Sequence, residues 1–345
     1  MEKEKEVFNS NRILYLDIAK AFAIICVILG HVIQFYDDNH EMKCVYDVIY
    51  SFHMPLFMTL SGFFISKSLD TRIDKVIFHK VRQLLVPVLA FTVLAFAVSF
   101  ITPFDMTKGL GFFAYMFGGD MWFLKYLFGC IVIACISKLI FRNTIIAALI
   151  PMLILISVSR VGIFRIYPFL WLGFFLHCNS NKIERYSKQI TIVSLLAFLI
   201  LLIFWHIEYD YPRYRWITIK HGISFNWFAL YVVVYRFLIG AVGSISAIAL
   251  FKFLPLPKVI KNTMSFIGKR TLGIYCLQIY LLEHAARYYP HLQLHGVWNI
   301  VYVLLLTIVF TSVCVALVCC LEKTKLTSFL FLGKKWGCVK IHTLF

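Results

Sequence analysis

The sequence predicts an all-α membrane protein with about ten spanning helices. Of its 345 residues, 61% are hydrophobic, 17% aromatic and only 15% charged, whereas a soluble domain is about half apolar and a quarter charged. Apolar runs near the roughly 20 residues that cross a bilayer recur from Ile13 to Cys320. We therefore expect one transmembrane domain over residues 1–345, with a short N-terminal segment at 1–12 and a C-terminal tail at 322–345.

The predicted spans follow the apolar runs in chain order. They cover residues 13–36, 45–66, 78–101, 122–140, 144–159, 163–178, 190–207, 227–251, 267–288 and 297–321. The first is expected to be a retained span, because its apolar run is longer than a signal-peptide core and lacks a small-residue cleavage site. The segment 208–226 is aromatic and mixed in charge, which predicts an interfacial cap on the outer side.

The net charge of +17 is explained largely by membrane topology. With the N-terminus in the cytoplasm, most of the 34 Lys and Arg residues fall in inside segments, including the connections after the second, sixth, eighth and tenth spans. The positive-inside rule therefore favours an N-in, C-in orientation, with the basic connections facing anionic lipid head groups. This placement indicates membrane lipids, not nucleic acid, as the partner of the basic residues.

Ionisable residues interrupt the first span. Asp17, Lys20 and His31 lie in an otherwise apolar run, where each costs about 2.5–3.5 kcal/mol at the membrane centre. Asp17 and Lys20 are one turn apart and can pair, although a snorkelling pair at the interface explains them equally well. Lys20 and His31 are separated by eleven residues, which returns to within about 20° of one helix face and spans roughly 16 Å.

The second span carries a histidine expected at a similar depth. His53 comes early in a helix that returns from the outside, so it can face the same cavity as His31. An imidazole titrates near neutrality and is suited to be a general base. Farther along, Pro55 and the small pair Ser61-Gly62 are tolerated where a helix lines a cavity. Ordinary helix packing is an equally good explanation of Ser61-Gly62.

No metal site is predicted. A zinc site takes three or four ligands, and no acidic residue lies near either histidine in the first two spans. The ten cysteines are scattered without a CxxC pair or metal-ligand spacing. We expect most of them to be small core-facing or lipid-facing residues.

The inner segment 67–82 is a candidate anion site. A cluster of cations suits a polyanionic ligand such as a nucleotide phosphate, although positive-inside bias alone explains most of it. Arg82 stands out because the apolar run QLLVPVLAF follows it directly. The cations of the segment are Lys67, Arg72, Lys75, Lys80 and Arg82. Other polar or amphipathic groups within or beside predicted spans are Trp122, which also fits an interfacial aromatic belt, and Lys125, Arg236 and Glu283.

Several of these motifs together resemble the membrane-bound acyltransferase 3 family, especially bacterial proteins similar to fucose 4-O-acetylase. The first-helix signature, a basic residue, ten residues and a histidine, is Lys20 to His31 within LDIAKAFAIICVILGH. The second-helix pattern is FHMPLFMTLSGFFIS, the third-helix pattern is KVRQLLVP and the fourth is WFL. The late signature is IGKRTLGIYCLQIYLLE, in which Gln278 stands where many relatives have histidine, so Gln278 is assigned no role.

The resemblance implies a multi-pass enzyme of the bacterial cytoplasmic membrane. It would move an acyl group, usually acetyl, from cytoplasmic acetyl-CoA to a hydroxyl of a cell-envelope glycan or lipid-linked sugar. His31 would be the catalytic imidazole and Lys20 the signature basic residue, with Asp17 and His53 as further catalytic candidates. The donor-side candidates are Arg82, Lys80, Lys75, Ser61 and Gly62.

Two other functions remain open. The polar face of the first span also fits the substrate path of a glycan transporter or flippase. A purely structural membrane partner is the third alternative, but it leaves Lys20, His31 and His53 unexplained.

Overall fold

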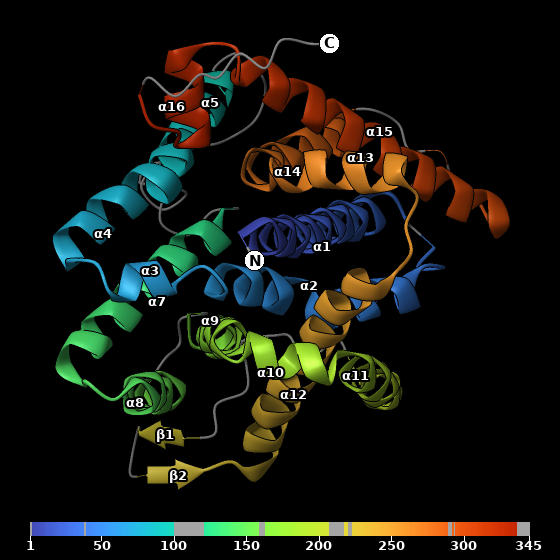
Figure 1. The fold of residues 1–345 in the computed structure, drawn as a ribbon. Helices are drawn as coiled ribbons and strands as arrows, with labels where there is room; N and C mark the ends of the chain where they lie inside the picture. The colour runs from blue at the N-terminus through green and yellow to red at the C-terminus, as the bar shows by residue number, and fades with distance from the viewer. Residues whose placement is uncertain are drawn as a thin grey trace. The chain divides into compact units, whose positions relative to one another are not determined.

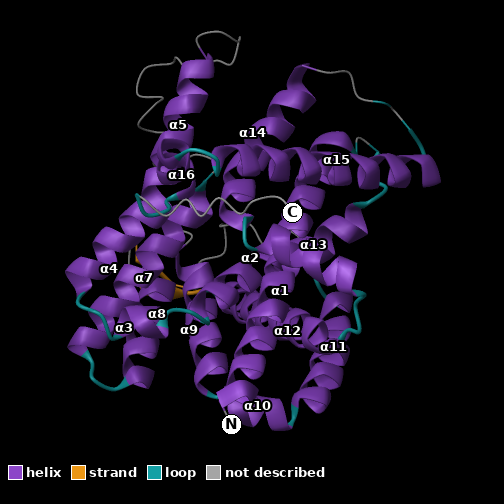
Figure 2. Cartoon of the chain, turned by 45° about the horizontal axis from the view of Figure 1, so that its top comes forward, coloured by secondary structure: helices purple, strands orange, loops and turns teal. Residues whose placement is uncertain are grey.

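The computed structural model describes residues 2–37, 39–99, 121–158, 163–206, 217–219, 223–288, 292 and 294–336. Over these residues the chain is helical apart from one small hairpin (Figures 1 and 2). In chain order the helices are α1 (Glu2–Tyr36), α2 (Lys43–Gly62), α3 (Ser66–Leu69), α4 (Ile73–Lys80), the π-helical turn η1 (Val81–Leu85), α5 (Val86–Ser99), α7 (Trp122–Ile140), α8 (Thr144–Val158), α9 (Ile163–Cys178), α10 (Ser180–Arg185), α11 (Ser187–Ile203), α12 (Trp227–Phe253), α13 (Lys258–Gly268), α14 (Thr271–Tyr288), α15 (Val297–Leu321) and α16 (Lys325–Leu332). The hairpin pairs β1 (Ile217–Ile219) with β2 (Ile223–Phe225) in antiparallel fashion.

Five of the described helical stretches are long and apolar enough to cross a membrane. They are Leu14–Tyr36, Ile73–Val98, Trp122–Ile140, Trp227–Phe253 and Val297–Leu321, and shorter apolar helices cover Thr144–Ile154, Ser187–Ile203 and Thr271–Glu283. Many large apolar side chains of α8, α11 and α15 are exposed, as expected for helices whose solvent is lipid. The helical class expected from the sequence is confirmed.

Several boundaries differ from the predicted ones because polar segments are helical too. The basic segment 67–82 contains most of α3, all of α4 and the start of η1, so the third predicted span begins earlier, at Ile73. The connection before the ninth span contains most of α13, which ends at Gly268, and the next helix begins at Thr271 instead of residue 267. The tail contains α16. Within the predicted cap, only the hairpin and Asn226 are described, and residues 100, 101, 159 and 207 of the predicted spans lie outside the described residues.

The chain divides into two compact units. The first comprises residues 1–30, 42–71 and 133–269, and the second comprises residues 31–41, 72–132 and 270–345. The helices α1 and α7 contribute residues to both units.

The first unit is built on α2, which packs against α9 and α12, while α11 packs against α12. Glycines let the α2 and α9 backbones meet. A Cβ atom on Gly62 would lie 2.0 Å from the carbonyl oxygen of Leu170, and one on Gly173 would lie 1.9 Å from that of Thr59. Such small residues permit close helix packing in membranes. Ordinary helix packing therefore accounts for Gly62.

In the second unit, α14 packs against α15, and α16 packs against α5. The ring centroids of Phe91 and Phe331 are 4.9 Å apart at this α5–α16 contact. At the end of α16, Gly333 adopts a left-handed conformation with φ of 61°. The predicted C-terminal tail is thus partly a packed element of this unit.

Candidate active site

The acidic and basic residues of α1 form an ion pair. The Lys20 ammonium lies 3.3 Å from an oxygen of Asp17, whose side chain is buried. The same ammonium lies 4.7 Å from the centroid of the Phe64 ring, which adds a cation–π contact. The close approach of Gly268, where a Cβ would lie 1.9 Å from the Asp17 carbonyl oxygen, packs α13 on this turn. The pairing predicted from the spacing of three is confirmed.

His53 on α2 is held in one tautomer. His53 is only 7% exposed, and its Nδ1 lies 2.7 Å from the carbonyl oxygen of Ile49. A carbonyl only accepts, so Nδ1 carries the hydrogen, and in the neutral ring Nε2 is the nitrogen with the lone pair. The Tyr50 ring packs edge-on against His53 at 4.9 Å. A buried imidazole of this kind can accept a proton at Nε2.

His31 lies in the second unit, one residue beyond Gly30 on α1. Its ring is half-buried, with Nδ1 3.3 Å from Gln34 Oε1 and the ring centroid 6.2 Å from that of Phe35. Gly30 belongs to the first unit, where Tyr50 of α2 would lie 3.2 Å from a Cβ at that position. Gly30 thus lets the Tyr50 ring approach α1 closely. The cavity expected to be shared by His31 and His53 stays a prediction.

Arg82 lies on the π-helical turn η1. Single π turns inside α-helices are frequent at functional sites. Pro87 has no N–H to offer to the carbonyl groups five and four residues before it, those of Arg82 and Gln83. The approach of Gly333 covers these two carbonyls, since its Cβ would lie 2.7 Å from each oxygen.

Of the Arg82 guanidinium nitrogens, one forms a hydrogen bond and another has no partner among the described residues. Nη2 donates to Nδ1 of His79 at 3.0 Å, while the buried Nε has no hydrogen-bond partner among the residues that the structure describes. Lys80 donates to the side-chain oxygen of Gln83 at 3.0 Å, and Lys75 is exposed. The turn and the helix before it therefore present cations that an anionic ligand can bind.

The donor-side candidates Ser61 and Gly62 lie elsewhere, in the first unit. The Ser61 hydroxyl donates to the carbonyl oxygen of Phe57 at 2.8 Å, and Gly62 contacts α9 as described above. The Gly62 contact packs α2 on α9, the Ser61 hydrogen bond lies within α2, and a donor-side role for either residue stays a prediction.

The other polar candidates fall in both units. Trp122 is partly exposed and lies against Tyr126, with ring centroids 5.5 Å apart. The next residue, Phe123, donates its backbone N–H to the Tyr275 hydroxyl at 3.3 Å, so the WFL motif is tied to α14. The half-buried candidates are Lys125 and Glu283 in the second unit and Arg236 in the first.

Two polar clusters of the second unit were not expected from the sequence. Buried Asn299 donates to Asp37 Oδ1 at 2.7 Å and to Glu41 Oε2 at 3.1 Å, which joins the end of α1 to the start of α15. Glu41 also accepts the backbone N–H of Gly296 at 2.9 Å. The partners are more than 250 residues apart in the sequence, so no local spacing of residues predicts these contacts.

The second cluster fixes α16. Glu322 accepts from Arg270 at 2.8 and 3.0 Å and from Lys334 at 2.9 Å. Burial acts to raise the pKa of Glu322, but the hydrogen bonds and charges of Lys334 and Arg270 outweigh it and lower that pKa below the ordinary value. Glu322 is thus an ionised bridge between the start of α14 and the end of α16.

Gln278 is buried, and its Oε1 has no hydrogen-bond partner within the described part of the chain. Over the same residues, no group of three His, Cys, Asp or Glu side chains is arranged to hold a metal ion.

Comparison with known proteins identifies the family. The model of the acyltransferase domain (Acyl_transf_3) matches residues 13–319. The chain is similar to nodulation protein NolL of Sinorhizobium fredii (strain NBRC 101917 / NGR234), with 32% identity over 206 residues that cover 55% of each chain. It is also similar to nodulation protein NolL of Mesorhizobium japonicum (strain LMG 29417 / CECT 9101 / MAFF 303099), with 33% identity over 103 residues that cover 28% of each chain.

The chain spans about half the length, or less, of these relatives. No solved structure matches it. The family match extends over residues of both compact units, from the polar face of α1 to α15. The chain therefore belongs to the acyltransferase 3 family.

Proposed function

We propose that the chain is a membrane O-acyltransferase that moves an acyl group, most simply acetyl, from cytoplasmic acetyl-CoA to a hydroxyl of a cell-envelope glycan or lipid-linked sugar. The observation that carries this function is that Lys20 and His31, at the family's spacing, lie on one continuous helix, α1, in a chain that belongs to the family.

We further propose a single transmembrane domain over residues 1–345, with ten spans and both termini in the cytoplasm of a bacterium. Each of the ten predicted apolar runs coincides with a described helix, which supports the count. The excess of Lys and Arg in the inside segments supports the orientation.

In the proposed reaction, His31 acts as the general base. Its imidazole takes the proton of the acceptor hydroxyl while the oxygen attacks the thioester carbonyl carbon. The new C–O bond forms, the C–S bond breaks, and the leaving thiolate takes up the proton from the imidazolium. The ester and free CoA are the products. Lys20, oriented by Asp17 at 3.3 Å, would support the donor or the charge that develops on the carbonyl oxygen.

His53 is a second candidate base in this scheme. The hydrogen bond from Nδ1 to Ile49 fixes its ring and directs the basic Nε2 away from the α2 backbone. On the donor side, the positive charges of Arg82, Lys80 and Lys75 would bind the phosphates of acetyl-CoA. Further donor-side or acceptor-side contacts of unassigned role are proposed for Ser61, Gly62, Trp122, Lys125, Arg236 and Glu283.

The test is acyl transfer by the full chain in nanodiscs, with radiolabelled acetyl-CoA and an envelope glycan fraction from cells that lack the protein. His31→Ala should insert normally and lose about 10²- to 10⁴-fold in rate, the usual contribution of a general base. His295→Ala, at an exposed histidine of the same unit, is the matched control. Activity retained by His31→Ala would refute the role of this residue. A transporter or flippase would give no acetyl-CoA-dependent labelling of any glycan.

A further inference from the structure

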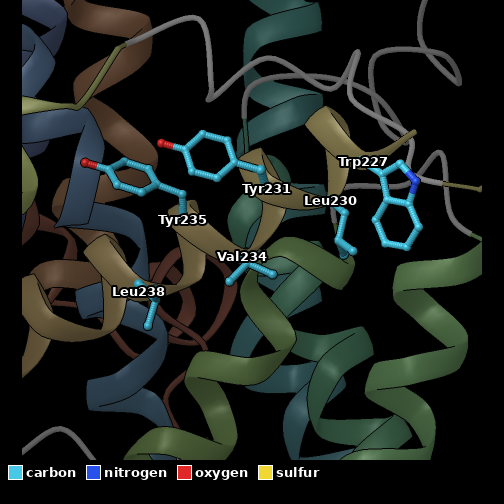
Figure 3. Close-up of a pocket in the computed structure, with 6 residues that line it drawn as sticks. All are labelled: Trp227, Leu230, Tyr231, Val234, Tyr235 and Leu238. Carbon is cyan, nitrogen blue, oxygen red and sulfur yellow. The ribbon is translucent and has the colours of Figure 1, made fainter. Parts of the chain in front are cut away.

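One face of α12 forms an open groove of about 340 Å³ in the first unit. Figure 3 shows its six lining side chains along a single helix, with Trp227 at one end and Leu238 at the other. The lining residues are Trp227, Leu230, Tyr231, Val234, Tyr235 and Leu238. Their spacings of three and four residues place them on one face of the helix, and none of the six carries a charge.

Aromatic rings form a row along this end of α12. The Tyr231 ring lies 5.8 Å from that of Tyr235, with 28° between the planes, and 6.3 Å from that of Phe228, with 31° between the planes. At the buried end, Trp205 lies 6.4 Å from Tyr235 with only 17° between the rings. The Tyr231–Tyr235 and Trp205–Tyr235 pairs are stacked and the Phe228–Tyr231 pair is tilted, so the rings form one continuous aromatic row.

The base of the row is immobilised by hydrogen bonds. The Tyr235 hydroxyl donates to the Leu201 carbonyl oxygen on α11. The Trp205 indole N–H donates to the Asp47 carbonyl oxygen on α2 at 2.8 Å. Three helices therefore hold the buried rings, while the other end stays open: Trp227 is 76% exposed and Tyr231 is 49% exposed.

An exposed, rigid aromatic surface suits the C–H face of a sugar ring. A pyranose presents axial C–H bonds on one face and hydroxyl groups at its edge, so it can stack on a ring and hydrogen-bond to the Tyr231 hydroxyl or the Trp227 indole N–H. None of the lining residues that the structure describes carries a charge, and these side chains match a neutral sugar better than a phosphate. Toward Leu238 the same face is aliphatic, which suits a hydrocarbon chain.

Resting on the proposed function, we propose that this face of α12 binds the acceptor, as a neutral pyranose stacked on Trp227 and Tyr231 with its hydrocarbon anchor along Val234 and Leu238. Trp and Tyr also collect at membrane interfaces as single anchors. An interfacial anchor needs only its polar tip in water, however, and a row of rings whose buried members Tyr235 and Trp205 are fixed by hydrogen bonds goes beyond that need.

The test uses photo-crosslinking of the full chain in phosphatidylcholine nanodiscs. The probe is dodecyl β-D-glucopyranoside with a diazirine on the sugar, and crosslinked peptides are mapped by mass spectrometry. Crosslinks within residues 227–238 should be displaced by unlabelled dodecyl glucopyranoside and not by dodecylphosphocholine. Trp227→Leu and Tyr231→Leu, which keep an apolar side chain, should each lower the specific yield about three- to tenfold.

Tyr186→Leu, at an aromatic residue 54% exposed beside α10 and α11, is the matched control and should leave the yield unchanged. Equal displacement by dodecylphosphocholine would show lipid contact only and overturn the inference. An unchanged yield in both Leu variants would overturn it as well. Because this measurement needs no acyl transfer, it is decided separately from the labelling assay that tests the enzyme.

Discussion

Replacing Gly333 by alanine is expected to detach α16 from the turn that carries Arg82. The left-handed conformation of Gly333, with φ of 61°, costs an L-residue about 1–2 kcal/mol. In addition, the new Cβ would lie 2.7 Å from the carbonyl oxygens of Arg82 and Gln83. Both oxygens belong to backbone, so the collision is relieved only by moving η1 or α16, at a cost of about 1–3 kcal/mol for overpacking. The two effects together disfavour docking by at least about 2 kcal/mol.

Hydrogen exchange of the amides in residues 325–336 and 81–86 measures this effect. A cost of 2 kcal/mol raises the open population about thirtyfold, since 1.4 kcal/mol is a factor of ten. Gly333→Asn separates the two causes, because asparagine tolerates the left-handed conformation but still carries the Cβ. Gly296→Ala is strained at φ of 61° with nothing within 4 Å, so it should not affect exchange in α16. Wild-type protection of residues 325–336 in Gly333→Ala would refute the reasoning.

Three further changes probe the packing and the charge clusters. Gly62→Ala, whose Cβ would meet the Leu170 carbonyl oxygen at 2.0 Å, should abolish the monodisperse peak in size-exclusion chromatography. Gly30→Ala meets only a ring atom at 3.2 Å and should keep that peak. Glu322→Gln should cost about 1–2 kcal/mol at neutral pH. Because the folded pKa of Glu322 is lowered, its contribution is complete above the ordinary value of 4.5 and is lost as the pH falls through the folded value. Proteolysis of α16 should therefore rise with acid in the wild type and stay flat in the variant; a parallel rise in both would contradict this. Asn299→Ala should lower stability by about 1–3 kcal/mol, because it removes a hydrogen bond from the buried carboxylate of Asp37, and an unchanged thermal unfolding temperature would argue against that role.

Hydropathy predicts the apolar helices of this chain well because it measures the property that lipid selects. The ten predicted runs all coincide with helices. It does not find α4, α13 or α16, which have only 8, 11 and 8 residues and are too short to cross a bilayer. Nor does it find the π-helical turn at Val81–Leu85, which depends on where Pro87 withholds a donor and on what covers the freed carbonyls.

The candidate site likewise has features that the sequence predicts and features that it does not. Asp17 and Lys20 are three residues apart, so their ion pair follows from helix geometry alone. The tautomer of His53 depends on a local carbonyl, which a spacing argument does not include. The contacts of Asn299 and Glu322 join residues distant in the chain, and one sequence holds no signal for such pairs.

The contact between α2 and α9 has a mechanical consequence. Gly62 and Gly173 each face the backbone of the other helix, so the two helices are in close backbone contact at two positions. Sliding α2 along α9 by one residue, or turning it about its axis, would bring a Cβ-bearing residue to a place where only hydrogen fits. The two helices therefore share one permitted register. Since His53 lies on α2, this register also fixes the position of the imidazole along α9, and α2 should resist sliding along α9 when a ligand binds.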